Sequence, residues 1–374
     1  MLTNVKTKEI EEVFKTPIIQ QTAFWSAVKK QVGLHSLAFD FKVKRSDVLD
    51  NKLSKESVVS DVLVFIQQLD NNHSVAYVPY GPELEPCEEK QGLFLEELSE
   101  CMRTWLPANC ILIRYDLSWE SLWAKTPHFY DEDGNWSGPP APSVQEMRLN
   151  FSTIGWNLKK ATTNILPSNT IYMDLGKSEA DLLESMKPKT RYNIGLSLRK
   201  GIQVRLAGVE ALDVWYKLYA ETARRNNFYL HDPEYFRAVL TVKANQTQSP
   251  AEVQLLIAEL DGKPLAAMFL VMTGNRGTYL YGASSSENRN FMSTYALQWK
   301  AMMIAKMRGC TDYDLFGVSP SPDPHHPMHG LYRFKTGFGG SMFHCMGCWD
   351  YPLNHDKYTC FKALELKSQG YHLA

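Results

Sequence analysis

A strand–helix–strand pattern occurs twice along the chain, and few folds accommodate such a repeat. A predicted strand ends at the Tyr-Gly pair 80–81, an apolar stretch with helical periodicity follows, and a second strand begins at Cys110. The same order recurs around the Tyr-Gly pair 281–282 and Cys310, with nearly the same spacing. The alternative is chance similarity of common residues. We predict that the chain holds two copies of one α/β unit.

The second copy follows the sequence signature of antiparallel strands. Between residues 252 and 282, apolar runs are separated by Asp261-Gly262 and by Gly274-Asn275, residue types that tolerate the positive φ of hairpin turns. Three antiparallel strands, then a helix over residues 293–307 and another strand, form the order of the acyltransferase fold known as GNAT. We expect this fold by analogy, which does not by itself fix a function.

Length and composition favour two domains. The 374 residues exceed what one ordinary domain uses, and 44% of them are hydrophobic, enough for a large core. By the same analogy with the GNAT fold, and as the family resemblance described below also implies, we expect two tandem GNAT-like domains of the α/β (α+β) class, with mixed, mainly antiparallel sheets flanked by helices. The first comprises residues 1–165 and 345–374, and the second residues 166–344. Residues 123–143, rich in Pro, Gly and Trp, are expected to form an ordered surface excursion.

Charge and cysteine content exclude several classes of protein. Forty Lys and Arg against forty-one Asp and Glu give a net charge of −1, so any nucleic-acid contact must be local. No apolar run is long enough to span a membrane and the first residues lack a signal-peptide core, so we predict a cytoplasmic protein. Seven cysteines fit reduced thiols better than disulfides. Because Cys345 and Cys348 lack a tidy second pair, we expect no metal.

The motifs of several common enzyme classes are missing. In GNAT acetyltransferases, backbone amides of a Gly-containing loop at a helix start bind the pyrophosphate of acetyl-CoA. The corresponding residues 289–294 contain no glycine, which argues against acetyl-CoA as the donor. The sequence also lacks a nucleophile elbow and a Walker loop.

Basic residues gather in a segment that is predicted to be a helix. Residues 187–201 contain five basic residues and no acidic one, with Pro188 suited to the helix start and Gly201 to its end. Such a cluster could bind phosphates, or it could be a solvated helical face. The candidates for contact with a nucleic acid are Lys189, Arg191, Arg199 and Lys200. Lys335 also stands out, because aromatic residues flank it after a long Pro- and His-rich loop.

In order and in detail, the short motifs resemble those of the FemABX family of peptidoglycan interpeptide-bridge aminoacyltransferases over essentially the whole chain. The matching segments are residues 25–29, 77–82, 114–116, 155–156, 173–175, 189–201, 281–284, 313–317 and 334–339. Residues 208–250 leave no room for the coiled-coil arm of staphylococcal members. The chain therefore looks like the shorter FemX type.

The resemblance implies non-ribosomal peptide-bond formation. An amino acid would pass from aminoacyl-tRNA to the amine of the stem-peptide diamino acid of a peptidoglycan precursor, either UDP-MurNAc-pentapeptide or lipid II. No cofactor is implied, since aminoacyl-tRNA is a co-substrate. A lipid-linked acceptor would require transient contact with a membrane surface. The alternatives are an acyltransferase that modifies a protein N-terminus or a polysaccharide amine, and a non-catalytic protein that binds tRNA or precursor.

The resemblance also implies roles for single residues. Lys335 matches a lysine near the reacting ester, where a cation can stabilise the oxyanion or hold the tRNA terminus. Tyr281 would line the acceptor channel, with Tyr279 two residues away on the same face. The base would be a substrate phosphate or carboxylate, or Asp116, which is at least as readily a structural turn carboxylate. The candidates near the diphosphate of the precursor are Lys29 and Arg225, with Thr222 and Arg224 as neighbours.

Overall fold

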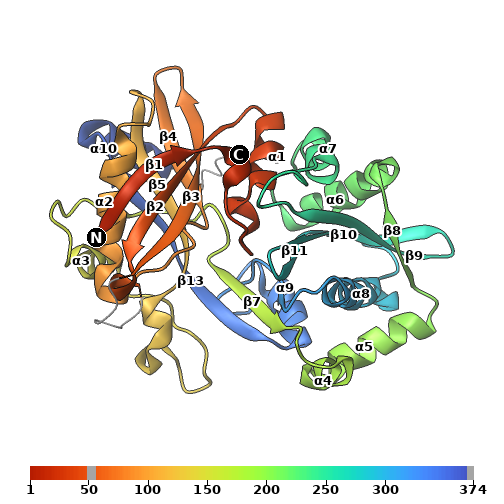
Figure 1. Ribbon diagram of the computed structural model, residues 1–374. Helices are drawn as coiled ribbons and strands as arrows, with labels where there is room; N and C mark the ends of the chain where they lie inside the picture. Colours follow the sequence, from red (N-terminus) through yellow and green to blue (C-terminus); the bar gives the residue numbers. More distant parts are fainter. Residues whose placement is uncertain (49–55, 369–374) are drawn as a thin grey trace.

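One sheet of 13 strands runs through the part of the chain that the computed structural model describes, residues 1–48 and 56–368. Helices cover both faces of this sheet, and the two halves of the chain lie side by side (Figure 1). Hydrogen bonding gives the strand order β1-β2-β3-β4-β5-β13-β7-β12-β11-β10-β9-β8, with β6 paired to β13 beside this path. The fold is therefore a mixed, largely antiparallel α/β arrangement, as the sequence predicts.

The first half supplies five consecutive strands and three helices. The strands are β1 (Leu2–Lys8), β2 (His35–Lys44), β3 (Ser57–Asp70), β4 (His73–Pro79) and β5 (Cys110–Glu120). The helices are α1 (Ala23–Gln31), α2 (Gln91–Arg103) and α3 (Pro142–Asn150), followed by the short strand β6 (Lys159–Lys160).

The second half contains the remaining sheet and six helices. Its strands are β7 (Asn169–Asp174), β8 (Gln203–Ala207), β9 (Glu252–Leu260), β10 (Lys263–Thr273), β11 (Arg276–Ser284) and β12 (Asp312–Asp314). Its helices are α4 (Glu179–Ser185), α5 (Pro188–Arg199), α6 (Leu212–Asn226), α7 (Pro233–Thr241), α8 (Ser293–Met307) and α9 (His329–Lys335). The chain ends with β13 (Ser341–Pro352) and α10 (His355–Ser368).

The repeated unit of the sequence is confirmed. Strands β4 and β5 are parallel and are connected through α2, and strands β11 and β12 are parallel and are connected through α8. Parallel neighbours need such a crossover connection, whereas the other strand pairs in the sheet are antiparallel. Each half therefore holds one β–α–β copy.

Both predicted hairpin turns are present. Asp261 and Gly262 connect β9 to β10 with φ of 48° and 77°, and Gly274 begins the turn from β10 to β11 with φ of 59°. A side chain at Gly274 would also collide with the backbone of Thr16 and Pro17, 2.8 to 2.9 Å away. This glycine thus lets the N-terminal segment approach the second half.

Strand β13 joins the halves into one sheet. Its residues Ser341–His344 pair with β7, and the stretch from Cys345 to Pro352 pairs with β5. The buried Arg114 guanidinium on β5 then forms ion pairs of 2.6 Å with Asp350 on β13 and Glu365 on α10. The predicted division assigns residues 345–374 to the first domain, so its second boundary falls within β13, and this division stays an interpretation. Residues 369–374 of that assignment lie outside the described part.

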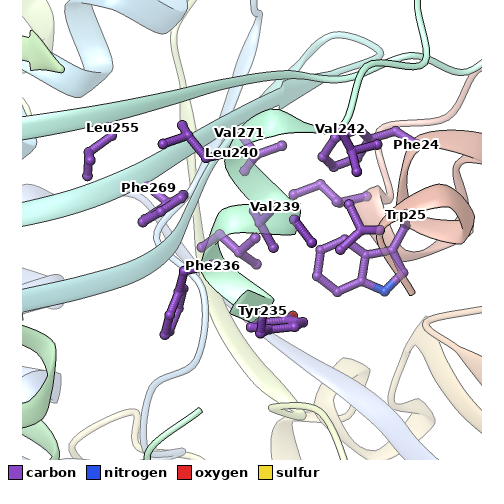
Figure 2. Close-up of a cluster of buried hydrophobic side chains, with 14 of the residues drawn as sticks. Phe24, Trp25, Tyr235, Phe236, Val239, Leu240, Val242, Leu255, Phe269 and Val271 are labelled. Atoms are coloured by element: carbon purple, nitrogen blue, oxygen red, sulfur yellow. The ribbon is translucent and has the colours of Figure 1, made fainter. Parts of the chain in front are cut away.

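The second half of the sheet has a different hydrophobic core on each face. One face carries α6 and α7 and is shared with α1 of the first half, and the opposite face carries α4, α5 and α8. Figure 2 shows α7 packed between β9 and β10 on one side and Phe24 and Trp25 of α1 on the other. This core fixes the first half against the second.

The predicted surface excursion is ordered. Two 3-10 turns, Leu122–Lys125 and Pro127–Phe129, precede a bridge between Tyr130 and Trp136. Among the described residues, no helix has the length and apolar character needed to cross a bilayer.

Candidate functional site

Lys29 lies at the end of α1, where the two halves meet. The helix begins at Thr22, whose hydroxyl oxygen accepts a hydrogen bond from the Trp25 amide at 3.1 Å. Phe24, Trp25 and Val28 are buried on the apolar face of α1, and this packing places Lys29 near α7. Its Nζ lies 5.0 Å from the ring centroid of Tyr235, and burial lowers the pKa of Lys29 to about 8.

Lys29 lies beside a cluster of aromatic side chains that includes Trp25 and Tyr235. The Tyr235 and Tyr281 hydroxyls are 2.6 Å apart and share a hydrogen bond, and the His231 ring stacks on Tyr235 with centroids 4.9 Å apart. Burial, helped by the charge of Lys29, lowers the pKa of His231 to about 4. Sequence reasoning predicted Lys29 and Tyr281 but missed His231 and Tyr235. The Asp232-Pro233 helix start between them was the available signal.

Hydrogen bonds connect the C-terminal end of α6 to the end of β11. Arg225 donates to the Ser284 carbonyl at 2.9 Å and to the Ser284 hydroxyl at 3.0 Å, and the Thr222 hydroxyl accepts from the Ser284 amide at 2.9 Å. Burial lowers the pKa of Arg225, although its side chain still reaches the surface. Arg224, the next residue on the helix, is exposed. Arg225 and Thr222 thus lie on the same sheet face as Lys29 and Tyr281.

One prediction about this strand is wrong: Tyr279 and Tyr281 lie on opposite faces of the sheet. Tyr281 pairs with Phe269 and Tyr279 with Leu270, so Leu280 is an extra residue in a β-bulge. A bulge reverses the usual two-residue alternation of side chains. Tyr281 consequently packs with the α6–α7 core, and Tyr279 with the α8 core on the other face.

Lys335 lies on the face of Tyr279. Its Nζ donates to the carbonyl oxygens of Phe316 at 3.0 Å and Gly317 at 2.7 Å, and it lies 5.2 Å from the Tyr279 ring centroid. Only 4% of the residue is exposed. Burial lowers the pKa of Lys335 to about 7, against the opposing attraction of Asp314.

The lysine sits where the parallel strands separate. Strand β11 pairs with β12 only from Arg276 to Thr278, although it continues along β10 to Ser284. After β12 the chain turns away at Phe316, whose φ is +59°. Lys335 therefore lies on the Tyr279 face of the sheet, beside the place where β11 and β12 separate.

A pocket of about 330 Å³ lies beside this position, lined by residues from both halves. Three of its side chains are acidic, Glu83, Glu85 and Asp314, and burial raises the pKa of each. Arg276 also lines the pocket, where its guanidinium lies 4.3 Å from the ring centroid of Tyr172 and its positive charge acts on Glu83 and Asp314. An acidic pocket of this kind suits an amine-bearing ligand.

Asp314 and Asp116 occupy matching places in the two repeats, since each follows a tyrosine and each is the last residue of its strand in the parallel pairing. Asp116 is fully buried and accepts hydrogen bonds from the Tyr77 hydroxyl at 3.1 Å and the Leu166 amide at 2.8 Å. Burial raises its pKa, and it does not line the pocket. Asp314 does line the pocket and also accepts from the Phe316 amide at 2.8 Å. Sequence reasoning selected Asp116, although the repeat itself pointed equally to Asp314.

The predicted basic helix is α5, and it lies next to the segment that carries Lys335. The Lys187 amide, before α5, donates to the Gly337 carbonyl at 2.9 Å. Lys189, Arg191 and Arg199 are exposed; Arg191 also donates to the Glu184 carbonyl at 3.0 Å, and the half-buried Lys200 donates to the Asn290 carbonyl at 3.1 Å. Two of the four basic residues are thus engaged by backbone carbonyls.

No group of three or more His, Cys, Asp or Glu within residues 1–48 and 56–368 is arranged to hold a metal ion. The longest described helices, α6 and α8, have 15 residues each, so the described part contains no coiled-coil arm.

Two β–α–β copies in one sheet, with a buried lysine where the second pair of parallel strands separates, define a tandem GNAT-like protein. The chain belongs to the FemAB family, whose sequence model matches residues 20–247 and 241–366.

Individual relatives agree with this assignment. Lipid II:glycine glycyltransferase of Staphylococcus epidermidis is 22% identical over an alignment of 280 residues, which covers 58% of this chain and 66% of that protein. The enzyme of the same name from Staphylococcus saprophyticus is 24% identical over an alignment of 285 residues, which covers 61% of this chain and 69% of that protein. The matched region thus spans about two thirds of the relatives. The crystal structure of FemX has the same fold, with a TM-score of 0.70 at 17% identity, covering 96% of this chain and 100% of FemX.

Proposed function

We propose that the protein transfers an amino acid from aminoacyl-tRNA to the stem-peptide amine of a peptidoglycan precursor. The observation that carries the proposal is the buried Lys335 ammonium beside the place where the parallel strands β11 and β12 separate, next to a pocket lined by both halves. A group-transfer enzyme that takes two large substrates must bring an acyl ester and an amine together while each remains bound elsewhere. The relatives named above are glycyltransferases that act on lipid II, which supports this class of acceptor.

The precursor would bind on the face of Lys29 and Arg225. Both are cations whose pKa burial lowers, beside the hydroxyls of Tyr281 and Thr222. Partly desolvated cations bind phosphate oxygens more strongly than fully hydrated ones. A diphosphate is common to UDP-MurNAc-pentapeptide and lipid II, so this site accepts either.

The tRNA would approach from the opposite face. Lys189 and Arg199 are exposed on α5, next to the segment that follows Lys335. Contacts with a few phosphates there are compatible with a chain of net charge −1, because the basic surface is local. Aminoacyl-tRNA is a cytoplasmic substrate, so we propose that the reaction takes place in the cytoplasm.

The proposed chemistry needs no cofactor, because the ester is already activated. The acceptor amine attacks the ester carbonyl carbon, the C–O bond to the terminal ribose of the tRNA breaks, and the ribose hydroxyl leaves with a proton. Lys335 stabilises the negative charge that develops on the carbonyl oxygen. Asp314 is better placed than Asp116 to accept the proton of the amine, since it lines the pocket and burial raises its pKa.

The test is transfer of label from a pool of aminoacyl-tRNAs by the purified protein. UDP-MurNAc-pentapeptide, lipid II and a protein with a free N-terminus serve as separate acceptors, and Lys335→Met and Lys243→Met serve as the variant and its exposed-lysine control. We expect label on a precursor, lost in Lys335→Met and kept in Lys243→Met. Label on the protein acceptor alone, or equal transfer by both variants, would reject the proposal.

A further inference from the structure

The loop between α6 and α7 exposes three apolar side chains in a row. Phe228, Tyr229 and Leu230 are exposed by 40%, 61% and 39%. We call residues 227–231 the aromatic loop. Single exposed apolar residues are ordinary on a protein surface, whereas several together on one short segment are characteristic of an interaction surface.

Contacts with the two helices hold both ends of the aromatic loop. Asn227 ends α6 in the left-handed conformation with φ of 53°, and the Phe228 amide donates to the Ala223 carbonyl at 3.2 Å. At the other end, the His231 ring stacks on Tyr235, with ring centroids 4.9 Å apart. The residues between these ends are therefore presented to solvent on a short, supported segment.

Both ends of the aromatic loop also border the proposed diphosphate site. Arg224 and Arg225 lie in the last turn of α6, directly before the loop. At the other end, burial and the charge of Lys29 together lower the pKa of His231 to about 4, which places this histidine near the lysine. A diphosphate held by Lys29 and Arg225 would thus lie next to the exposed side chains of the loop.

Positive charge around the aromatic loop is only partly compensated. Residues 29, 30 and 221–237 include five basic residues against three acidic ones. Within the described residues, no ion pair engages Lys29, Lys30 or Arg224. The three acidic residues have other partners, namely the Ser286 amide for Glu221, the Glu234 amide for Asp232 and the Arg237 side chain for Glu234. This surface therefore suits an anionic group.

The geometry points to contact of the aromatic loop with the bilayer that holds a lipid-linked acceptor, whose diphosphate Lys29 and Arg225 bind beside the loop. This inference rests on the proposed function and concerns the form of its acceptor. The diphosphate of such a lipid lies at the bilayer surface, because it joins the buried chain to the hydrated sugar. A loop that borders the diphosphate site then meets the headgroup region, where aromatic and aliphatic side chains beside cations are favoured.

The alternative occupant is the uridine of the soluble precursor, which takes the place of the lipid on the far side of the diphosphate. A flat base stacks on a ring through one of its faces. Three consecutive side chains of a loop project in different directions, so one base covers them less completely than a fluid medium that closes around the loop. The exposed row Phe228-Tyr229-Leu230 therefore fits the lipid better.

Contact with the bilayer would also orient the second substrate. Helices α6 and α7 cover one face of the sheet and α5 covers the opposite face, and Figure 1 shows α7 and α5 on opposite sides of the second half. The face of Lys29 then turns toward the membrane, and the exposed basic residues of α5 turn away from it. A tRNA bound at α5 thus stays clear of the bilayer.

The direct test is co-sedimentation of the full chain with phosphatidylcholine vesicles that contain a polyprenyl diphosphate, and with phosphatidylcholine alone. This lipid carries the chain and the diphosphate without sugar or peptide, so the assay does not depend on transfer. We expect binding to be at least about tenfold tighter with the diphosphate lipid, and Tyr229→Ser with Leu230→Ser to weaken it at least about tenfold. The control replaces two exposed apolar residues elsewhere, Leu206→Ser with Met307→Ser, and should bind as the wild type does.

Three outcomes overturn the inference. The wild type does not bind the diphosphate vesicles, or the Tyr229→Ser/Leu230→Ser variant, shown to be folded by its thermal unfolding, binds them as well as the wild type. The third outcome is an equal loss of affinity of this variant for UDP in titration calorimetry, which would assign the loop to the uridine.

Activity separates this inference from the proposed function. If both hold, the Tyr229→Ser/Leu230→Ser variant raises KM for lipid II in vesicles at least about tenfold and changes KM for UDP-MurNAc-pentapeptide less than about threefold. Vesicle binding without transfer to either acceptor would reject the proposed function and leave the loop as a lipid contact. Transfer to UDP-MurNAc-pentapeptide without vesicle binding would do the reverse.

Discussion

The Lys335 ammonium donates a hydrogen bond of 2.7 Å to the Gly317 carbonyl oxygen, which joins α9 to the turn that follows β12. The Phe316 carbonyl accepts a second bond from the same nitrogen at 3.0 Å. Two neutral acceptors hold the cation in place without cancelling its charge, and the nearest opposing carboxylate, Asp314, also lines the interdomain pocket. A positioned charge of this kind can stabilise a developing oxyanion.

The buried charge of Lys335 should make stability depend on pH. Its pKa is about 7 in the folded protein, whereas an unfolded lysine titrates near about 10.4. Between these values the unfolded chain binds more protons, so the free energy of unfolding rises with pH. The loss of stability caused by burying the charged Lys335 is largest below about pH 7 and decreases as the pH rises above that value. Relative to Lys335→Met, the wild type should gain up to about 1.4 kcal/mol for each pH unit between about 7 and 9. Urea unfolding at several pH values measures this, and parallel curves for the two proteins would contradict it.

Replacing Lys29 should weaken precursor binding. Lys29→Ala removes a partly desolvated cation from the proposed diphosphate site, and we expect KM for the precursor to rise about 10- to 100-fold with a small change in kcat. Lys30→Ala is the matched control, since Lys30 is the next residue of α1 and is exposed. Steady-state kinetics at saturating aminoacyl-tRNA decide the matter. An equal rise in KM in the two variants would show that the total charge of α1, and not the position of Lys29, determines precursor binding.

The two repeat aspartates should behave differently. Asp116→Asn disturbs a buried acceptor of bonds from Tyr77 and Leu166, so it should lower the free energy of unfolding by about 1–3 kcal/mol and leave transfer by the folded protein intact. Asp314→Asn should lower kcat at least about tenfold if the carboxylate accepts the proton. Chemical unfolding and single-turnover transfer are measured on both variants. Loss of turnover in Asp116→Asn but not in Asp314→Asn would identify Asp116, the candidate predicted from the sequence, as the base.

The exposed basic residues of α5 should determine the salt dependence of tRNA binding. Replacing Lys189 or Arg199 by Ala should weaken binding and reduce the slope of log K against log salt by about 1 for each lost phosphate contact. Lys217→Ala on α6 serves as the control, because Lys217 is exposed on the opposite side of the sheet. Filter binding at several salt concentrations gives the slope. An unchanged slope would place the tRNA elsewhere on the protein.

The local sequence was sufficient to predict those helices and turns whose sequence signals lie within a few residues of one another. The helix predicted over residues 293–307 is α8, and the Asp261-Gly262 and Gly274-Asn275 turns connect the predicted strands. Helical periodicity and residues that tolerate positive φ act over one or two turns of chain, so they can be recognised without knowledge of the rest of the fold. The repeat was found for the same reason.

The arrangement of side chains around Lys335 depended on contacts between distant segments. A bulge at Leu280, fixed by pairing with β10, moved Tyr279 and Tyr281 to opposite faces. The Tyr-Asp pairs of the two repeats are locally alike, yet Leu166 and Tyr77 enclose Asp116 while Asp314 lines a pocket between the halves. The sequence by itself determined the repeated units and their basic and aromatic residues. Only the tertiary structure decided which of them share a face, because strand register and burial are set by partners far away in the chain.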